Sequence, residues 1–191
     1  MSSSFDTTRC IAAAVLAAAT ALSSAWAQTV VPGQSEIAFV SRQMGVPVEG
    51  RFKRFDAQIS FDPKKPEAGK VAFTIDTASA SFGSREIDAE LPKAAWFNAS
   101  KFPQATFVST SIKGAGAGRY DVVGRLTIKG QSRDVLVPVT LSQNAAAGVA
   151  IGSFTIRRLE FSIGDGEWAD TSMVANDVLV KFRLTLSGLP G

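Results

Sequence analysis

Histidine is absent from the 191 residues, and cysteine occurs once, as Cys10. Histidine is the usual general base near neutral pH and a frequent metal ligand, so its absence excludes Ser-His-Asp and Cys-His catalysis. A single cysteine cannot form a disulfide within the chain or supply a site of several thiolates. The composition therefore indicates a protein that is not an enzyme and binds no metal, and we identify no catalytic residue.

Long apolar runs are also scarce. Residues 11–22 form one, which follows Arg9 and precedes the small residues Ala25 and Ala27. A membrane-spanning helix needs about 20 apolar residues, so this shorter run is typical of a cleaved secretory signal, with a membrane anchor as the weaker alternative. We predict a signal peptide over residues 1–27, one domain over residues 28–191, and export from the cytoplasm.

Neither sign of charge dominates the chain. It carries 20 Lys and Arg against 17 Asp and Glu, a net charge of +3, and the basic residues are scattered. Nucleic-acid binding needs a basic patch, so we expect no nucleic-acid partner. The positive sign is compatible with a transient contact with anionic membrane surfaces. The sequence leaves a homodimer open.

Apolar and polar residues alternate along most of the domain, as at Val135, Val137 and Val139. This period of two predicts half-buried strands. We expect eight strands, over residues 35–43, 48–61, 70–77, 104–113, 119–129, 132–142, 148–161 and 176–187. Most connections are too short for parallel crossovers, so neighbouring strands are predicted to be antiparallel. The one long connection, between the third and fourth strands, contains a predicted short helix around residues 84–91.

Eight meandering strands leave two exposed edges unless the sheet closes on itself. We therefore predict an all-β fold, an eight-stranded antiparallel up-and-down barrel, with a two-sheet sandwich as the alternative. Gly50, Gly124 and Gly152 fall inside predicted strands. Glycine weakens a strand, so we interpret Gly50 as a bend at a barrel corner and the other two in the same way.

The stretch WFNASKFPQATF, residues 96–107, is unusually aromatic for a connection. Its rings must fill a core or meet something apolar, because surface loops are normally polar. Trp96, Phe97 and Phe102 precede the fourth strand and so should lie near one mouth of the barrel. They can cap a tunnel there or plug its end without meeting a ligand.

Six segments, in order, resemble the YceI-like family of bacterial periplasmic proteins. They are SEIAF (35–39), VEGRF (48–52), FDP (61–63), WFN with FPQATF (96–107), GRLTIKG (124–130) and RRLEFSIG (157–164). The resemblance implies an extended lipocalin-like barrel that holds a long isoprenoid lipid, of the quinone or polyprenyl-phosphate type, in its lumen. The chain departs from the family at residues 88–91, DAEL, where many relatives have a histidine before the leucine.

Such a lipid would bind mainly through buried hydrocarbon. The candidate lining residues are the apolar faces of the strands and the aromatic connection: Phe39, Phe52, Ile59, Phe61, Phe73, Trp96, Phe97, Phe102, Phe107, Val122, Leu126, Val137, Val180, Phe182 and Leu184. Arg42 and Arg85 are candidate partners for a phosphate or quinone oxygen, since a guanidinium offers fixed donors. From the residues alone, a solid core without a cavity remains the alternative reading of these side chains.

The predicted function is therefore that of a periplasmic protein that binds an isoprenoid lipid for transport or storage, with no other cofactor. The alternative is an exported structural or stress-related barrel that acts through its surface and holds no lipid.

Overall fold

The computed structural model describes residues 28–144 and 147–190, which form a single antiparallel sheet with one short helix. The predicted signal peptide lies outside these residues. The strands are β1 (Thr29–Val30), β2 (Glu36–Gln43), β3 (Val46–Phe52), β4 (Phe55–Ser60), β5 (Lys70–Asp76), β6 (Ala80–Ser81), β7 (Gln104–Gly116), β8 (Arg119–Ile128), β9 (Gln131–Gln143), β10 (Gly148–Arg157) and β11 (Asp177–Ser187). The α-helix is α1 (Arg85–Glu90), and 3-10 turns are η1 (Pro32–Gln34), η2 (Pro66–Ala68), η3 (Thr77–Ser79), η4 (Arg158–Phe161) and η5 (Gly166–Ala169).

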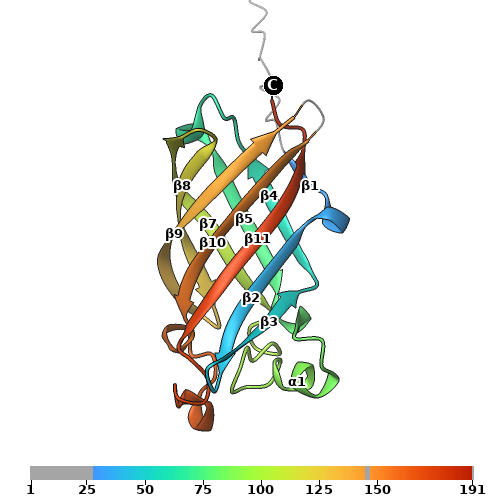
Figure 1. Ribbon diagram of the computed structural model, residues 1–191, viewed down its shortest axis with the longest axis vertical. Coiled ribbons are helices and arrows are strands. Elements are labelled where there is room, and N and C mark those ends of the chain that lie inside the picture. Colours follow the sequence, from blue (N-terminus) through green and yellow to red (C-terminus); the bar gives the residue numbers. More distant parts are fainter. Residues whose placement is uncertain (1–27, 145–146, 191) are drawn as a thin grey trace, which may run out of the picture.

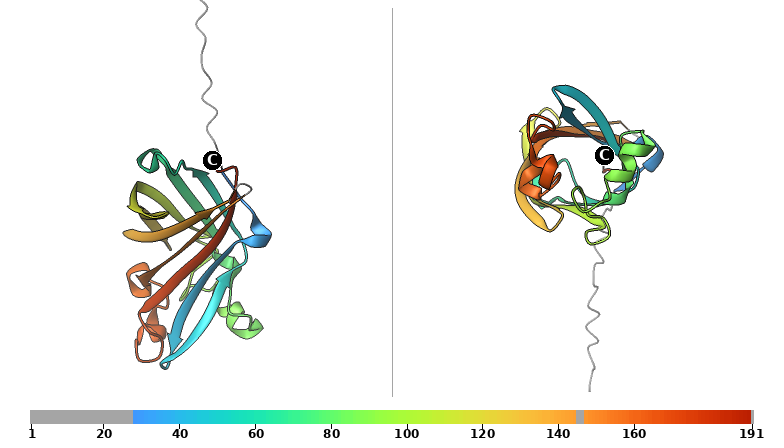
Figure 2. Two further views of the ribbon diagram at one scale, coloured as in Figure 1. Left: turned by 45° about the horizontal axis from the view of Figure 1, so that its top comes forward. Right: turned by 90° about the horizontal axis from the view of Figure 1, so that it is seen from below.

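The strands pair in the order β4-β5-β7-β8-β9-β10-β11-β2-β3-β6, with β1 added to β11. Every pairing is antiparallel, as the short connections predicted. The sheet curls strongly, and seen from below its strands run around a central axis (Figures 1 and 2). The all-β, antiparallel prediction with one short helix is therefore confirmed. The predicted closure into a full barrel is not: the order begins at β4 and ends at β6, and these two strands do not pair in the described part of the chain, so the sheet is a strongly curled half-barrel.

The predicted count of eight strands is wrong, because eleven strands occur in the part of the chain that the structure describes. Residues 48–61 were expected to form one strand, but they divide between β3 and β4. The backbone N–H of Lys53 donates to Ser79 O (3.1 Å) and that of Arg54 to Ser79 Oγ (3.0 Å), so the ladder is interrupted there. The chain then changes partner from β2 to β5. The break is thus at Lys53 and Arg54, and Gly50 lies within regular pairing to Phe39.

The first described residues connect two distant strands of the sheet. The backbone N–H of Gln28 donates to Ile59 O on β4 (2.9 Å), and Thr29 pairs with Ser187 on β11. At the other end of the sheet order, β3 continues into β4 through only two residues. Both ends of the order are therefore tied together by the chain, which holds the sheet in its curled form.

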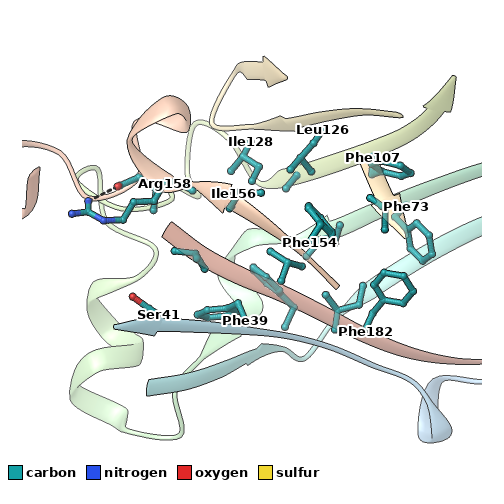
Figure 3. Close-up of a pocket in the computed structure, with 18 of the residues that line it drawn as sticks. Phe39, Ser41, Phe73, Phe107, Leu126, Ile128, Phe154, Ile156, Arg158 and Phe182 are labelled. Carbon is teal, nitrogen blue, oxygen red and sulfur yellow. Dashed lines mark hydrogen bonds between the residues drawn. The ribbon is translucent and has the colours of Figure 1, made fainter. Parts of the chain in front are cut away.

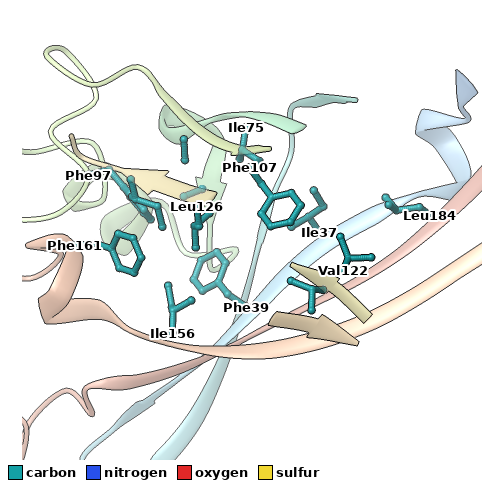
Figure 4. Packing of buried hydrophobic residues seen from close by; sticks show 14 of the residues in the cluster. Ile37, Phe39, Ile75, Phe97, Phe107, Val122, Leu126, Ile156, Phe161 and Leu184 are labelled. Carbon is teal, nitrogen blue, oxygen red and sulfur yellow. The ribbon is translucent and has the colours of Figure 1, made fainter. Parts of the chain in front are cut away.

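The inner face of the curled sheet carries the apolar core. Side chains from strands far apart in the sequence, such as Phe39 on β2, Phe107 on β7 and Ile156 on β10, point toward the same interior space (Figure 4). The outer face carries polar residues together with exposed apolar ones such as Val108 and Leu136, because successive residues of a strand point to opposite sides. The period of two in the sequence thus positions the apolar interior.

Helix α1, the β2–β3 turn and residues 158–176 lie together at one end of the sheet (Figure 1). Asp88 holds α1 in place, because its carboxylate accepts hydrogen bonds from Ser81 Oγ (2.5 Å) and from the Phe82 N–H (2.7 Å). The contact with Ser81 and then the backbone N–H of Phe82 hold the pKa of Asp88 below its usual 3.8, although partial burial opposes the shift. Among the described residues, no helix has the length and apolar character needed to cross a membrane.

Acidification should release helix α1 before the rest of the fold. The folded-state pKa of Asp88 is depressed, so its contribution to stability is complete above pH 3.8 and is lost as the pH falls through the lower folded value. The hydrogen-exchange protection factors of residues 84–91, which are relative to the intrinsic exchange rate at each pH, should therefore fall below about pH 4, and Asp88→Ala should show similarly low protection at pH 7. Equal protection of this helix in the variant and the unchanged protein would contradict the anchoring role.

Candidate functional site

The curled sheet encloses a cavity of about 430 Å³. This volume falls within the range of roughly 300–1,000 Å³ that small-molecule sites occupy. Of the 40 residues that line it, only four have a non-aromatic polar side chain: Ser41, Gln43, Glu90 and Arg158. The wall is otherwise aliphatic or aromatic, with rings contributed by strands on several sides (Figure 3). The cavity is therefore suited to an elongated hydrocarbon.

Most of the residues proposed from the sequence lie in the cavity wall. These are Phe39, Phe52, Ile59, Phe61, Phe73, Trp96, Phe97, Phe107, Val122, Leu126, Val137, Val180, Phe182 and Leu184. They come from β2, β3, β4, β5, β7, β8, β9, β11 and the connections after β4 and α1. The alternation of apolar residues accounts for those on the strands, whereas Phe61, Trp96 and Phe97 reach the same surface from connections.

Three of the proposed residues do not line the cavity. The ring of Phe102 lies beside Gly130, where an added Cβ would be 3.1 Å from its Cε1, so this side chain packs under the β8–β9 turn. Arg42 lies between the inward-facing Ser41 and Gln43, so the alternation of β2 places it outside. Arg85 begins helix α1 and is exposed.

Sequence reasoning missed a second group of lining residues, including Ile37, Ser41, Gln43, Phe82, Glu90, Phe154, Ile156, Arg158, Trp168 and Met173. The alternation around Phe39 could have revealed Ser41 and Gln43, which share its face. Glu90 is the last residue of helix α1, and Trp168 and Met173 lie in the connection between β10 and β11. In these segments no sequence period predicts which side chains face the cavity.

The aromatic connection contributes to one end of the cavity. Trp96 lines it together with Trp168, and their ring centroids are 5.5 Å apart. Phe97 is buried and packs edge-on against Phe52, with centroids 5.8 Å apart. Two of the three rings expected at the mouth therefore do lie against the cavity, and Phe102 does not.

Three glycines make room for phenylalanine rings along the wall. A Cβ on Gly50 would lie 2.5 Å from the Phe39 ring, one on Gly124 would lie 2.3 Å from the Phe107 ring, and one on Gly152 would lie 2.5 Å from the Phe182 ring. Each ring thus covers a neighbouring glycine backbone, and a side chain at the glycine would push the ring away from the wall. The glycines therefore help to keep the interior open.

The cavity opens at the end that carries helix α1. Lining residues there are exposed: Met44 by 79%, Met173 by 47% and Ile87 by 38%. At the opposite end Phe61 and Tyr120 are half-buried, and they pack edge-on with ring centroids 4.9 Å apart. We call the exposed end, formed by Met44, Ile87 and Met173, the mouth.

All four polar lining residues lie near this mouth. Gln43 pairs with Val174, whose carbonyl accepts from Arg158 Nη2 (2.7 Å), and Ser41 precedes Gln43 on the same face of β2. Glu90 ends helix α1. Figure 3 shows Ser41 and Arg158 at one end of the cavity and Phe73, Phe107 and Phe182 at the other. The cavity is therefore polar at its opening and apolar in its depth.

Arg158 organises the backbone around the mouth. It is only 1% exposed, and its five N–H groups donate to the carbonyl oxygens of Ala175, Ile163, Gly164, Trp168 and Val174 at 2.7–3.0 Å. Burial lowers the pKa of its guanidinium, and nearby Asp165 opposes this shift. Because all of its donors are used, Arg158 fixes the loop of residues 158–176 rather than offering a free cation.

Metal binding has no support in the described part of the chain, where no group of three His, Cys, Asp or Glu side chains could hold an ion.

Gly50→Ala should displace the Phe39 ring into the cavity. The close atoms all belong to this ring, so it can move, and we expect a folded protein destabilised by about 1–2 kcal/mol. Gly33→Ala is the control, since nothing lies within 4 Å of its added Cβ. Thermal denaturation and a crystal structure of each variant would test this. Equal stability and an unmoved ring in Gly50→Ala would contradict the role of the glycines.

Arg158→Met should destabilise the fold by roughly 3–5 kcal/mol, because five buried carbonyl groups lose their donor. Arg157→Met is the matched control: the side chain of Arg157 is 66% exposed and its Nη1 lies 3.5 Å from Glu160. Chemical denaturation compares the two. The structural role of Arg158 would be disproved by a free energy of unfolding within 1 kcal/mol of the control (roughly the noise of surface substitutions).

Comparison with known proteins agrees with this architecture. A YceI-like domain model matches residues 28–186. "Protein YceI" of Salmonella arizonae is 46% identical over 92 residues, which cover 48% of this chain and 46% of that protein. The matched segment thus spans about half the length of that curated relative.

Solved structures share the fold over most of the chain. BcnA of Burkholderia cenocepacia has a TM-score of 0.80 and 46% identity, covering 82% of this chain and 98% of that one. A polyisoprenoid binding domain from Saccharophagus degradans, implicated in plant cell wall breakdown, has a TM-score of 0.70 and 18% identity, covering 85% and 99%. The latter likeness concerns the fold alone. Because the domain model covers well over half of its residues, this chain belongs to the YceI-like domain family.

Proposed function

We propose that the protein binds a long isoprenoid lipid in its cavity and carries or stores it in the periplasm. The observation that supports this most directly is the wall of the cavity, in which nearly every side chain is aliphatic or aromatic. A polyprenyl chain gains about 0.8 kcal/mol for each methylene it buries, so such a wall supplies affinity without specific polar contacts. Binding, rather than catalysis, is then the activity.

The distribution of polar groups sets the direction of the ligand. Ser41 and Gln43 face the cavity near the mouth, and the deeper wall at Phe107, Phe182 and Leu184 is apolar. A lipid would therefore enter tail first and leave its head group near Ser41. The fold of the Saccharophagus polyisoprenoid binding domain is compatible with such a ligand.

The exposed apolar residues of the mouth favour transfer at a membrane surface. Met44, Ile87 and Met173 are at once exposed and part of the cavity lining. A transient contact of this rim with a bilayer would let a lipid tail pass into the cavity without crossing water. This contact is part of the proposal.

Lipid extraction and mass spectrometry of the purified protein test the proposed function. We expect an isoprenoid lipid in near-stoichiometric amount. Repeated preparations that contain no lipid, and that also fail to take one up from vesicles, would instead favour a protein that acts through its surface.

Phe107→Glu and Phe182→Glu should abolish lipid binding, because a buried carboxylate in the wall cannot be solvated beside a hydrocarbon tail. Val108→Glu is the matched control: Val108 follows Phe107 on β7 and is 51% exposed on the outer face. Uptake of a radiolabelled prenyl lipid from vesicles would measure binding, and circular dichroism would verify folding. A folded Phe107→Glu or Phe182→Glu variant that binds as well as Val108→Glu would refute the proposed location.

A further inference from the structure

Two polar side chains at the mouth have no hydrogen-bond partner in the described part of the chain. Ser41 Oγ and the Gln43 carboxamide face the cavity from β2, and neither makes a hydrogen bond there. Ser41 is only 7% exposed, and its oxygen borders the cavity rather than packed protein. A hydroxyl group that borders the cavity and makes no hydrogen bond to the protein is free to bind a ligand atom.

The charges at the mouth do not suit an anionic ligand. Among the described lining residues Arg158 is the only cation, and its five N–H groups already donate to backbone carbonyl groups. The other charged lining residue is Glu90, whose Oε1 accepts from Lys93 Nζ (2.5 Å). A phosphate bound beside Ser41 and Gln43 would give up hydrogen bonds to water without gaining a charged donor. It would also lie near the carboxylate of Glu90.

We infer that Ser41 and Gln43 form a head-group subsite for an uncharged head with a carbonyl or hydroxyl oxygen, such as a quinone or a prenyl alcohol, in preference to a phosphate. A serine hydroxyl donates or accepts, and a carboxamide does both, so the pair can bind either kind of oxygen. Glu90 holds Lys93 Nζ in an ion pair, so this cation is not free to bind an anion either. This inference rests on the proposed lipid-binding function and specifies the class of lipid.

The position of the subsite fits the path of a tail. Phe39 lies two residues deeper than Ser41 on the same face of β2, and Phe154 and Phe107 follow along the cavity (Figure 3). A head group held by Ser41 would place the first isoprenoid units against Phe39. The rest of the tail would run along the apolar wall.

Three lipids with the same prenyl tail test the inference: a quinone, an alcohol and a monophosphate. Each is titrated against delipidated protein, and displacement of the uncharged fluorescent probe N-phenylnaphthylamine reports binding. We expect the monophosphate to bind at least about tenfold more weakly than the other two, because its charge finds no free donor. Ser41→Ala should weaken the quinone and the alcohol by about twofold to tenfold, the value of one neutral hydrogen bond.

Two variants provide the controls. Ser153→Ala removes a hydroxyl from the exposed face of β10 and should leave all three affinities unchanged. Glu90→Gln should strengthen binding of the monophosphate alone. The inference would be overturned by a monophosphate that binds as tightly as the quinone, or by Ser41→Ala behaving like Ser153→Ala. If none of the three lipids displaces the probe, the proposed function itself fails.

Discussion

The structure depends on aromatic rings that lie over glycine backbone on the inner face of a strongly curled sheet. Phe39 covers Gly50, Phe107 covers Gly124 and Phe182 covers Gly152. A residue with a Cβ at any of these glycines would drive a ring toward the centre, where it would meet side chains from the opposite wall. The same rings that supply an apolar surface are thus held away from the axis. A cavity and a stable core are built from one set of residues.

The two ends of this cavity differ in a way that gives it a direction. The deep end is apolar, and the few polar lining groups lie at the mouth, where the buried guanidinium of Arg158 holds the surrounding backbone. Asp88 positions helix α1 beside it. Hydrogen bonds fix the backbone around the mouth, and the deeper wall offers only non-directional apolar contacts. This combination suits a ligand with a small head and a long tail.

The sequence predicted the inner face of the sheet well, because a period of two assigns every second residue of a strand to one side. Fourteen of the fifteen apolar residues proposed for the cavity lie in its wall, and the family resemblance was confirmed. The strand count missed the two-residue strands β1 and β6, and it missed the break at Lys53 and Arg54, where hydrogen bonds to Ser79 interrupt the ladder. Ser79 is distant from these residues in the sequence, so no local pattern predicts its hydrogen bonds with them. Arg42 lies outside the cavity for a simpler reason, since the alternation of β2 already places it on the outer face.

A crystal structure of the protein purified without detergent tests the central claim most directly. We expect continuous elongated density along the cavity, from the side chain of Ser41 at the mouth to that of Leu184 in the depth, with the rings of Phe39, Phe107 and Phe182 resting on their glycines. Rings that meet across the axis and leave no continuous space for a hydrocarbon chain would contradict it.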